Sequence, residues 1–590
     1  MELFTLGICK KNKLLKPSFS VIFSSNSYTK SMSFWKIWGI GAVVAIFLSL
    51  LMCLPKYGQI PAGLNRDEAA LGYNAYSLLK TGKDEWGKSW PISITSFGDQ
   101  KLPGYIYTLI PFIALFDLEI WVVRLPSLLA GLIVMIGMGL ITMKLTKLAK
   151  YSSNWQLMAS FIVMILIAIS PWHMHFSRVA YETHLAMAFF VSSVTCLFFA
   201  LDTSHQLWQR ILLAKAGLLA GLTLLTYHGY QIFTPLFLLA FLIIFFKQIK
   251  KLDKIGLTMG VFFCLLSVGL LISGGVLQAN QAKSQGINPF NNQVLLKKAT
   301  EYRSASNLSP LINKILFNKV NEGLITFTQN YVSTFSGTFF FIHGSGHGDH
   351  NPGNGNNTNL FLAPFILLGL LALGKHYQEK NAQIIIAWIL LALIPSSLTI
   401  NPLLEVRLGA IFPIIELLAV IGIFSLLSFL SNSQKKLVSI LLISIGLIST
   451  IRLFIFYTTL APIISVDNTH YHLLAKTLFK YQENNEAVLT QSPASSPYIW
   501  YLFENKIDPV VAQESIIHHP TTDEGFKHVK QLNNIYFETI NWNDLNQQSY
   551  ILILKPTEIS LDQRMNPQFS LIEVIANTKN QTIYEVWKYN

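Results

Sequence analysis

The sequence predicts an α-helical membrane protein with many spans, followed by a small α/β domain outside the membrane. Hydrophobic residues make up 52% of its 590 residues and charged residues only 13%, about half the charged share of a soluble domain. Eleven apolar runs are long enough to cross a bilayer as helices. After residue 457 the charge and the Asn/Gln content rise. There, short apolar stretches such as 550–554 accompany a helical pattern at 470–482, which is typical of an α/β domain.

A spanning helix needs about 20 predominantly apolar residues. The runs that meet this need are 37–55, 124–146, 155–171, 183–201, 211–227, 231–246, 256–276, 359–374, 382–400, 408–430 and 437–457. A twelfth apolar run, 103–117, is short and contains two prolines. This run is either a further span or a helix that lies at the membrane surface.

Loop charge decides between these two topologies. The formal net charge is +13, and cations gather in short loops such as 144–150, 247–254 and 435–436. If 103–117 lies at the surface and the N-terminus is cytoplasmic, these loops all face the cytoplasm, as the positive-inside rule requires. If 103–117 spans, the bias reverses. We therefore expect about eleven spans, with these segments outside: 56–123, 172–182, 277–358, 401–407 and the tail from about 458.

Three regions follow from this topology. Residues 1–36 are polar and basic without periodicity, so we expect a disordered cytoplasmic leader. Residues 37–457 form the transmembrane domain, and 458–590 form a soluble domain outside the cytoplasm. Nucleic acid is not an expected partner, because no basic stripe interleaves with stacking aromatic residues.

The first outer loop, 56–123, concentrates polar residues at the membrane surface. Asn65 is suited to cap a helix from about 66 to 80, which places Asp67 and Glu68 in its first turn. Acids at this position can simply stabilise the helix dipole. However, Asp84, Asp99 and Lys101 follow in the same loop, and acids beside a cation at the bilayer rim suit a polar lipid head group.

Shorter outer segments carry further candidates. Arg178 and Glu182 are four residues apart, so they form a local ion pair or a functional pair at the membrane boundary. Tyr227 and its neighbour His228 open another span, where a tyrosine belongs to the interfacial aromatic belt or stacks on a sugar. Arg407 either snorkels to the surface or holds a phosphate bidentately.

The glycine-rich stretch HGSGHGDHNPGNGN offers His343, His347, Asp349 and His350. Its spacing includes a His pair four residues apart, but the glycines disfavour the helix that would present both to a metal. A flexible loop that covers the substrate is the favoured interpretation. We therefore expect no metal site and no cofactor, with a divalent metal as the less favoured alternative. The four cysteines have no metal-type spacing.

Several stretches, which follow one another along the chain, resemble the bacterial members of the protein O-mannosyltransferase and aminoarabinose-transferase superfamily. These proteins are membrane glycosyltransferases of the GT-C fold. The most specific is DEAALGYNAYSLLKTGKDEWG at 67–87, followed by SFGDQKLPGYIYTLIPF and WVVRLPSLLAG within 96–131. SPWHMHFSRVAYE, YHGYQIFTP, the HG…HNPGNGN loop and the R-L-G-A-x-x-P element at 407–413 come after them. The resemblance covers about 37–430 and leaves the tail unassigned.

The resemblance implies a polyprenyl-phosphate sugar donor, an enzyme in the plasma (inner) membrane and transfer outside the cytoplasm. The acceptor is a glycan, a lipid or a protein. It makes Asp67 the general base, with Glu68 beside it, and gives Lys101, Arg178 and Arg407 to the donor phosphate. The substrate-binding candidates are Asp84, Asp99, Glu182, Tyr227, His228 and His350. Gln100 stands where the aminoarabinose transferases have Glu, and Gln231 stands where many relatives have a cation.

The chemistry is consistent with these residues. A positioned carboxylate that takes the acceptor proton contributes about 10²–10⁴-fold, and cations stabilise the charge that grows on the leaving phosphate. With one base and no covalent intermediate, the anomeric configuration inverts. The alternatives are a transferase that uses a lipid-pyrophosphate glycan, which a metal requirement would favour, and a transporter or flippase. A transporter places its ionisable groups or broken helices near the midplane.

Overall fold

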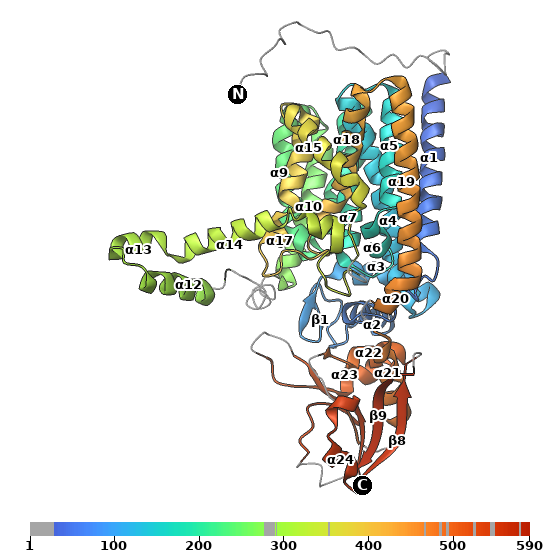
Figure 1. Ribbon diagram of the computed structural model, residues 1–590, viewed down its shortest axis with the longest axis vertical. Coiled ribbons are helices and arrows are strands. Elements are labelled where there is room, and N and C mark those ends of the chain that lie inside the picture. Colours follow the sequence, from blue (N-terminus) through green and yellow to red (C-terminus); the bar gives the residue numbers. More distant parts are fainter. Residues whose placement is uncertain are drawn as a thin grey trace.

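The computed structural model describes residues 29–589, apart from 277–289, 291, 352–354, 465–467, 483–486, 491–494, 523–526, 543–548 and 578–579. Most of the predicted leader therefore lies outside the described residues. A tall helical bundle occupies one part of the molecule, and a smaller sheet domain formed by the end of the chain lies below it (Figure 1).

Every one of the eleven predicted runs coincides with a helix of the bundle. These helices are α1 (Thr29–Cys53), α4 (Ile120–Leu148), α5 (Ser153–Ala168), α7 (Glu182–Asp202), α8 (Gln206–Leu224), α9 (His228–Ile249), α10 (Lys254–Ser273), α15 (Ala363–Lys375), α16 (Lys380–Ala392), α18 (Phe412–Phe429) and α19 (Asn432–Ile455). Within the described part of the chain, nine helical stretches are long and apolar enough to cross a membrane, whereas α5 and α15 belong to shorter apolar helices. The chain is a multi-pass membrane protein.

Small residues allow neighbouring helices to approach closely, as in other membrane bundles. A Cβ atom on Gly217 of α8 would lie 2.0 Å from the carbonyl oxygen of Gly260 in α10. Likewise, a Cβ on Gly422 of α18 would lie 1.8 Å from the carbonyl oxygen of Phe365 in α15. These contacts leave no room for a side chain at either crossing.

One end of the bundle carries short elements from the first two outer loops (Figure 1). They are α2 (Arg66–Thr81), β1 (Ile94–Ser96), β2 (Asp99–Lys101), α3 (Pro103–Phe116) and α6 (Pro171–Phe176). The predicted cap is present: the Asn65 side chain accepts from the Glu68 N–H at 2.9 Å, and Glu68 completes a capping box. The 14-residue α3 follows the β1–β2 hairpin and packs on α2.

The start of α1 and the sheet domain lie at opposite ends of the bundle (Figure 1). An odd number of crossings produces this arrangement. The long loop between α10 and α15 contributes α12 (Asn292–Ala305), α13 (Pro310–Leu316), α14 (Lys319–Ser333), η1 (Phe339–His343) and η3 (Leu360–Leu362). Short segments complete the bundle: α17 (Ile394–Ser397), η4 (Gly409–Ile411), η5 (Phe456–Leu460) and α20 (Ala461–Ile464).

The end of the chain forms a seven-stranded mixed sheet with strand order β4-β5-β6-β3-β7-β9-β8. The strands are β3 (Ala487–Thr490), β4 (Ile516–His518), β5 (Val529–Leu532), β6 (Ile535–Phe537), β7 (Tyr550–Leu554), β8 (Phe569–Ala576) and β9 (Thr582–Tyr589). Only the pairings of β3 with β6 and β7 are parallel. The helices are α21 (Thr469–Gln482), α22 (Tyr498–Glu504), α23 (Pro509–Ser515), η8 (Pro556–Glu558) and α24 (Leu561–Met565). The α21 helix and β7 lie where the sequence places them.

The sheet domain is docked directly on the first outer loop. The Trp500 indole N–H donates to the Leu64 carbonyl at 2.8 Å, and the Tyr73 hydroxyl donates to the Ile507 carbonyl at 3.0 Å. A Cβ on Gly72 of α2 would meet the Phe503 ring at 2.6 Å. The start of α2 is therefore held between the bundle and the sheet domain.

Candidate active site

Asp67 and Lys101 form the centre of the polar cluster at this end of the bundle. Asp67 lies in the first turn of α2, and Lys101 ends β2. The Lys101 Nζ lies 2.6 Å from the Asp67 Oδ1 and 3.7 Å from the Asp99 Oδ2. The lysine side chain is only 4% exposed, whereas that of Asp67 is 55% exposed. The pair thus presents a carboxylate to the outside and keeps its cation buried.

The surroundings of Lys101 keep it charged. Burial by itself would lower the pKa of its ammonium, but the carboxylates of Asp67, Asp99 and Glu182 outweigh burial and raise the pKa above its ordinary value. Glu182 begins α7, so its influence shows that this helix reaches the same cluster. Two acids therefore lie beside one buried cation, and a third acts on it electrostatically.

The Lys101 ammonium lies where it would compete with a metal ion for the carboxylates of the cluster. It lies within reach of both Asp67 and Asp99, where a divalent cation bridging the two carboxylates would have to sit. Among the described residues, no group of three or more His, Cys, Asp or Glu is arranged to hold a metal ion. The carboxylates of Asp67 and Asp99 thus already contact an ammonium group, whereas a hard cation prefers six or more oxygen ligands.

Tyr227 and Arg407 are electrostatically coupled to each other, and Tyr227 is coupled to the acids of the same cluster. Burial raises the pKa of the Tyr227 hydroxyl above its ordinary value; Arg407 opposes this, and Glu182 and Asp67 add to it. The Arg407 guanidinium donates to the Asn401 carbonyl at 3.0 Å. Next to Tyr227, His228 is the first residue of α9. Two further segments thus place a phenol and a guanidinium within electrostatic range of the cluster.

His350 of the glycine-rich loop approaches from the other side. Burial lowers its pKa to about 3, with the neighbouring His347 acting in the same direction and Asp67 opposing. Its ring stacks on that of His347 at 4.3 Å and meets the Tyr181 ring edge-on at 5.7 Å. A neutral imidazole can donate or accept a hydrogen bond but adds no charge to the cluster.

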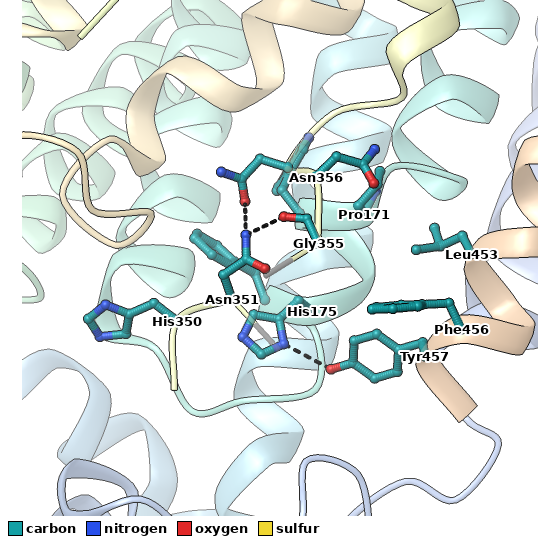
Figure 2. A pocket seen from close by; sticks show the side chains of 12 residues that line it. Pro171, His175, His350, Asn351, Gly355, Asn356, Leu453, Phe456 and Tyr457 are labelled. Carbon is teal, nitrogen blue, oxygen red and sulfur yellow. Dashed lines mark hydrogen bonds between the residues drawn. The ribbon is translucent and has the colours of Figure 1, made fainter. Parts of the chain in front are cut away.

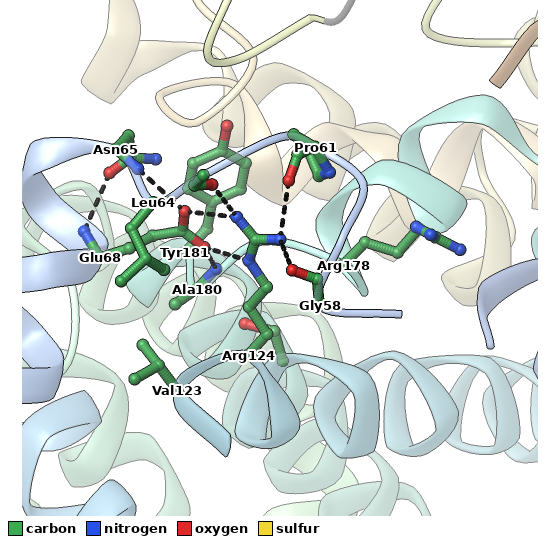
Figure 3. Close-up of polar contacts among 12 residues, drawn as sticks. Gly58, Pro61, Leu64, Asn65, Glu68, Val123, Arg124, Arg178, Ala180 and Tyr181 are labelled. Atoms are coloured by element: carbon green, nitrogen blue, oxygen red, sulfur yellow. Dashed lines mark hydrogen bonds and ion pairs between the residues drawn. The ribbon is translucent and has the colours of Figure 1, made fainter. Parts of the chain in front are cut away.

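Glu68 is buried, whereas its neighbour Asp67 is exposed. The Glu68 carboxylate is almost completely buried and accepts from the Nε and Nη2 atoms of Arg124, at 2.9 and 3.0 Å (Figure 3). It also accepts from the Ala180 N–H at 2.8 Å and the Asn65 N–H at 3.2 Å. With both oxygens occupied, Glu68 ties α2 to α4 and to the second outer loop.

Arg178 likewise occupies a closed position. Its fully buried guanidinium donates only to backbone carbonyls, those of Cys53, Pro55, Lys56 and Ile60, at 2.6–3.1 Å. Figure 3 shows its side chain pointing away from Arg124 and Glu68. These contacts fix the exit from α1, and they do not bring the arginine to the Asp67–Lys101 pair.

Asp84 is buried in a turn of the same loop. Its Oδ1 accepts the N–H groups of Trp86 and Lys88 at 3.0 and 2.9 Å. The neighbouring Glu85, an acid of the same loop that was not among the predicted site residues, accepts from Asn74 at 3.0 Å and from the Tyr498 hydroxyl of the sheet domain at 2.7 Å. Burial raises the pKa of Glu85 to about 7. Both acids shape the loop and its contact with the sheet domain.

Glu405 anchors the glycine-rich loop, and no sequence pattern singled it out. Its fully buried carboxylate accepts from the Ser345 N–H at 2.8 Å and hydroxyl at 2.5 Å, and from the amides of Asn351 and Asn357, both at 3.2 Å. Gly344 has φ +59°, and a Cβ there would lie 1.9 Å from the Asn351 amide nitrogen. The loop that carries His350 is therefore tied to the segment that carries Arg407.

A small cavity lies behind this loop, lined by His175, His350, Asn351 and Tyr457 among others (Figure 2). The His175 ring nitrogen Nδ1 is 2.8 Å from the Tyr457 hydroxyl, and Tyr181 donates to the Asp349 carbonyl. The cavity holds about 30 Å³, which is room for water but not for a sugar.

No family model matches the chain, and no curated protein matches it. Among solved structures, ArnT from Cupriavidus metallidurans in the apo state matches with a TM-score of 0.53 and 12% identity, over 95% of this chain and 98% of that chain. The oligosaccharyltransferase AglB from Archaeoglobus fulgidus, in complex with an inhibitory peptide and a dolichol-phosphate, matches with a TM-score of 0.50 and 13% identity. This match covers 81% of the chain but only 64% of AglB. The chain therefore has the GT-C fold of these two membrane proteins.

Proposed function

We propose that this protein is a membrane glycosyltransferase that moves a sugar from a polyprenyl-phosphate carrier to an acceptor hydroxyl. The observation that carries the proposal is the Asp67–Lys101 pair: an exposed carboxylate and a buried ammonium 2.6 Å apart, on the first loop of a membrane bundle. An acceptor needs a base, and a phosphate leaving group needs a cation. This pair supplies both at the membrane boundary.

Asp67 is the proposed general base, because its half-exposed oxygens can reach an acceptor from outside. Lys101 and Arg407 are the proposed ligands of the donor phosphate. Both are cations of the cluster, and the phosphate gains charge as the anomeric bond breaks. Glu68 and Arg178 are positioning residues in this proposal, since protein groups already occupy their polar atoms.

The remaining residues of the cluster suit the sugar and the acceptor. Tyr227 and His350 offer uncharged rings and hydrogen-bonding groups, and Glu182 and Asp99 offer carboxylates for hydroxyl groups. With one carboxylate acting as base and no covalent intermediate, the reaction inverts the anomeric centre. The cluster lies at the end of the bundle opposite the start of α1, so we place it outside the cytoplasm, with the plasma membrane as the site of action.

The likeness to AglB, whose structure contains a dolichol-phosphate, supports a lipid-phosphate carrier. The likeness to ArnT supports a shared architecture, because nearly the whole of both chains aligns. The alternative donor, a lipid-pyrophosphate glycan, would be favoured by a metal requirement. The lysine between Asp67 and Asp99 favours the monophosphate instead.

The test is sugar release from a radiolabelled polyprenyl-phosphate sugar by the purified protein in lipid, beside Asp67→Asn. We expect turnover by the parent and a loss of about 10²–10⁴-fold in the variant, with the same thermal unfolding midpoint. Equal turnover by both proteins would remove Asp67 from the mechanism. No release from the monophosphate donor, with metal-dependent release from a lipid-pyrophosphate glycan, would favour the pyrophosphate donor.

A further inference from the structure

The segment from α12 to α14, residues 292–335, forms an arm that leaves the bundle sideways, across the direction of the spanning helices (Figure 1). Along α14, apolar and polar residues separate onto two faces at helical spacing. The apolar face carries large exposed side chains: Val320, Leu324, Ile325, Val332 and Phe335 are 49–63% exposed. The opposite face carries polar residues such as Gln329, with Glu322 and Gly323 buried on it.

The end of the arm that joins the bundle is held in place by hydrogen bonds. The Asn330 amide donates to the carbonyls of Ser397 and Thr399 at 3.1 and 3.0 Å, and the Tyr331 hydroxyl donates to that of Leu390 at 2.9 Å. The candidate span Lys380–Ser397 ends at this point. The arm therefore leaves the bundle at the membrane boundary, on the side that carries the Asp67–Lys101 pair.

The arm also has the charge of a membrane-surface element. Residues 292–335 contain five basic and two acidic residues. Lys297, Lys298, Lys314 and Lys319 are all exposed. An exposed apolar stripe on an amphipathic helix, with lysines beside it and at the boundary of a bilayer, fits the interface between acyl chains and anionic head groups.

We propose that the arm lies on the membrane surface, with the apolar face of α14 among the upper acyl chains and its lysines on anionic phospholipid head groups. The proposal stands apart from glycosyl transfer, because it depends only on the depth of the arm and on its two faces. It extends the membrane contact of the protein sideways from the bundle on the side of the candidate site.

The test uses the full chain in lipid discs with a nitroxide attached to Leu324→Cys on the apolar face or to Gln329→Cys on the polar face. The parent, treated in the same way, gives the background of its own cysteines. In anionic discs, we expect the label at 324 to collide with dissolved oxygen several-fold more often than with an aqueous nickel chelate. The label at 329 should show the reverse preference.

A second variant, Lys297→Gln/Lys298→Gln/Lys314→Gln/Lys319→Gln, tests the head-group contact. We expect it to reduce the protection of position 324 in anionic discs to the level that the unaltered arm shows in zwitterionic discs. Three results would overturn the proposal: equal nickel access at 324 and 329, protection of 324 from both reagents (which would indicate a protein partner), or no effect of lipid charge.

Discussion

Two neighbouring carboxylates at the start of α2 have opposite surroundings. Glu68 is enclosed, with Arg124 and two backbone N–H groups on its oxygens, whereas Asp67 is 55% exposed and pairs with Lys101. In an α-helix, successive residues are about 100° apart, so one faces the bundle and the other faces outward. One helical turn therefore supplies both an enclosed ion pair and an exposed one, and the exposed pair is the one proposed to react.

The two cations differ in the same sense. Arg124 is fully buried and also donates to the Pro61 and Gly63 carbonyls at 3.0 and 2.6 Å. Its planar fork suits this fixed, bidentate role. Lys101 is buried as well, but its ammonium ends at a carboxylate that is open to the outside. The enclosed pair holds the loop in place, whereas the open pair is the one to which we assign the proposed chemistry.

The largest effect should follow from breaking the enclosed pair. Glu68→Ala leaves the Arg124 charge buried without its partner, which costs about 3–5 kcal/mol. We expect a much lower thermal unfolding midpoint in a fixed detergent. The control is Glu379→Ala, which removes an exposed carboxylate. Equal midpoints for the two variants would contradict a structural role for Glu68.

The open pair should respond in activity. Lys101→Met removes the cation proposed to stabilise the leaving phosphate, so we expect turnover to fall by about 10²–10³-fold. The free energy of unfolding should change less than in Glu68→Ala, because water can still solvate the exposed Asp67 carboxylate. Turnover within a few-fold of the parent would assign Lys101 to structure alone.

A smaller effect should follow from loosening the glycine-rich loop. Glu405→Gln replaces a carboxylate that accepts four hydrogen bonds, and one amide oxygen cannot satisfy all of the same donors. Misplacing His350 should lower turnover by up to about 10²-fold and raise hydrogen exchange at 344–351. Unchanged exchange in this segment would show that Glu405 does not anchor the loop.

The smallest effect should be a pH dependence from Glu85. Burial raises its pKa to about 7 in the folded protein, above the value of about 4.3 for an exposed glutamate. The folded state therefore binds the proton more tightly, and this contribution to stability is lost as the pH rises from about 4.3 to 7. Glu85→Gln should flatten the change of the unfolding midpoint over this window. An equal slope in both proteins would contradict the raised pKa.

Local patterns in the sequence predict much of this architecture. Apolar runs predicted every bundle helix, and Asn65 with Glu68 predicted the capped start of α2. Apolar length alone did not settle the number of crossings, because α5 and α15 are shorter than a typical span. The tail was predicted as α/β from α21 and β7, but the strand order depends on contacts between distant segments.

The residues of the candidate site also divide into those that local sequence patterns indicate and those whose roles depend on distant contacts. Asp67, Lys101 and Arg407 stand out as charges at the edges of apolar runs. Glu405 and Glu85 do not, because their roles depend on Ser345, 60 residues away, and Tyr498, 413 residues away. The sequence also could not separate Glu68 from Asp67. Which of two adjacent acids faces the bundle depends on Arg124, 56 residues further on.

The most direct test of the account compares Asp67→Asn with Glu68→Gln, two changes of one atom at adjacent positions. Turnover of a polyprenyl-phosphate sugar is measured per folded molecule, with the unfolding midpoint of each protein measured in the same lipid. We expect Asp67→Asn to keep the midpoint and lose turnover, and Glu68→Gln to lose stability while its folded fraction still turns over. The reverse pattern, or equal losses in both variants, would contradict the division between an open, reactive carboxylate and an enclosed, structural one.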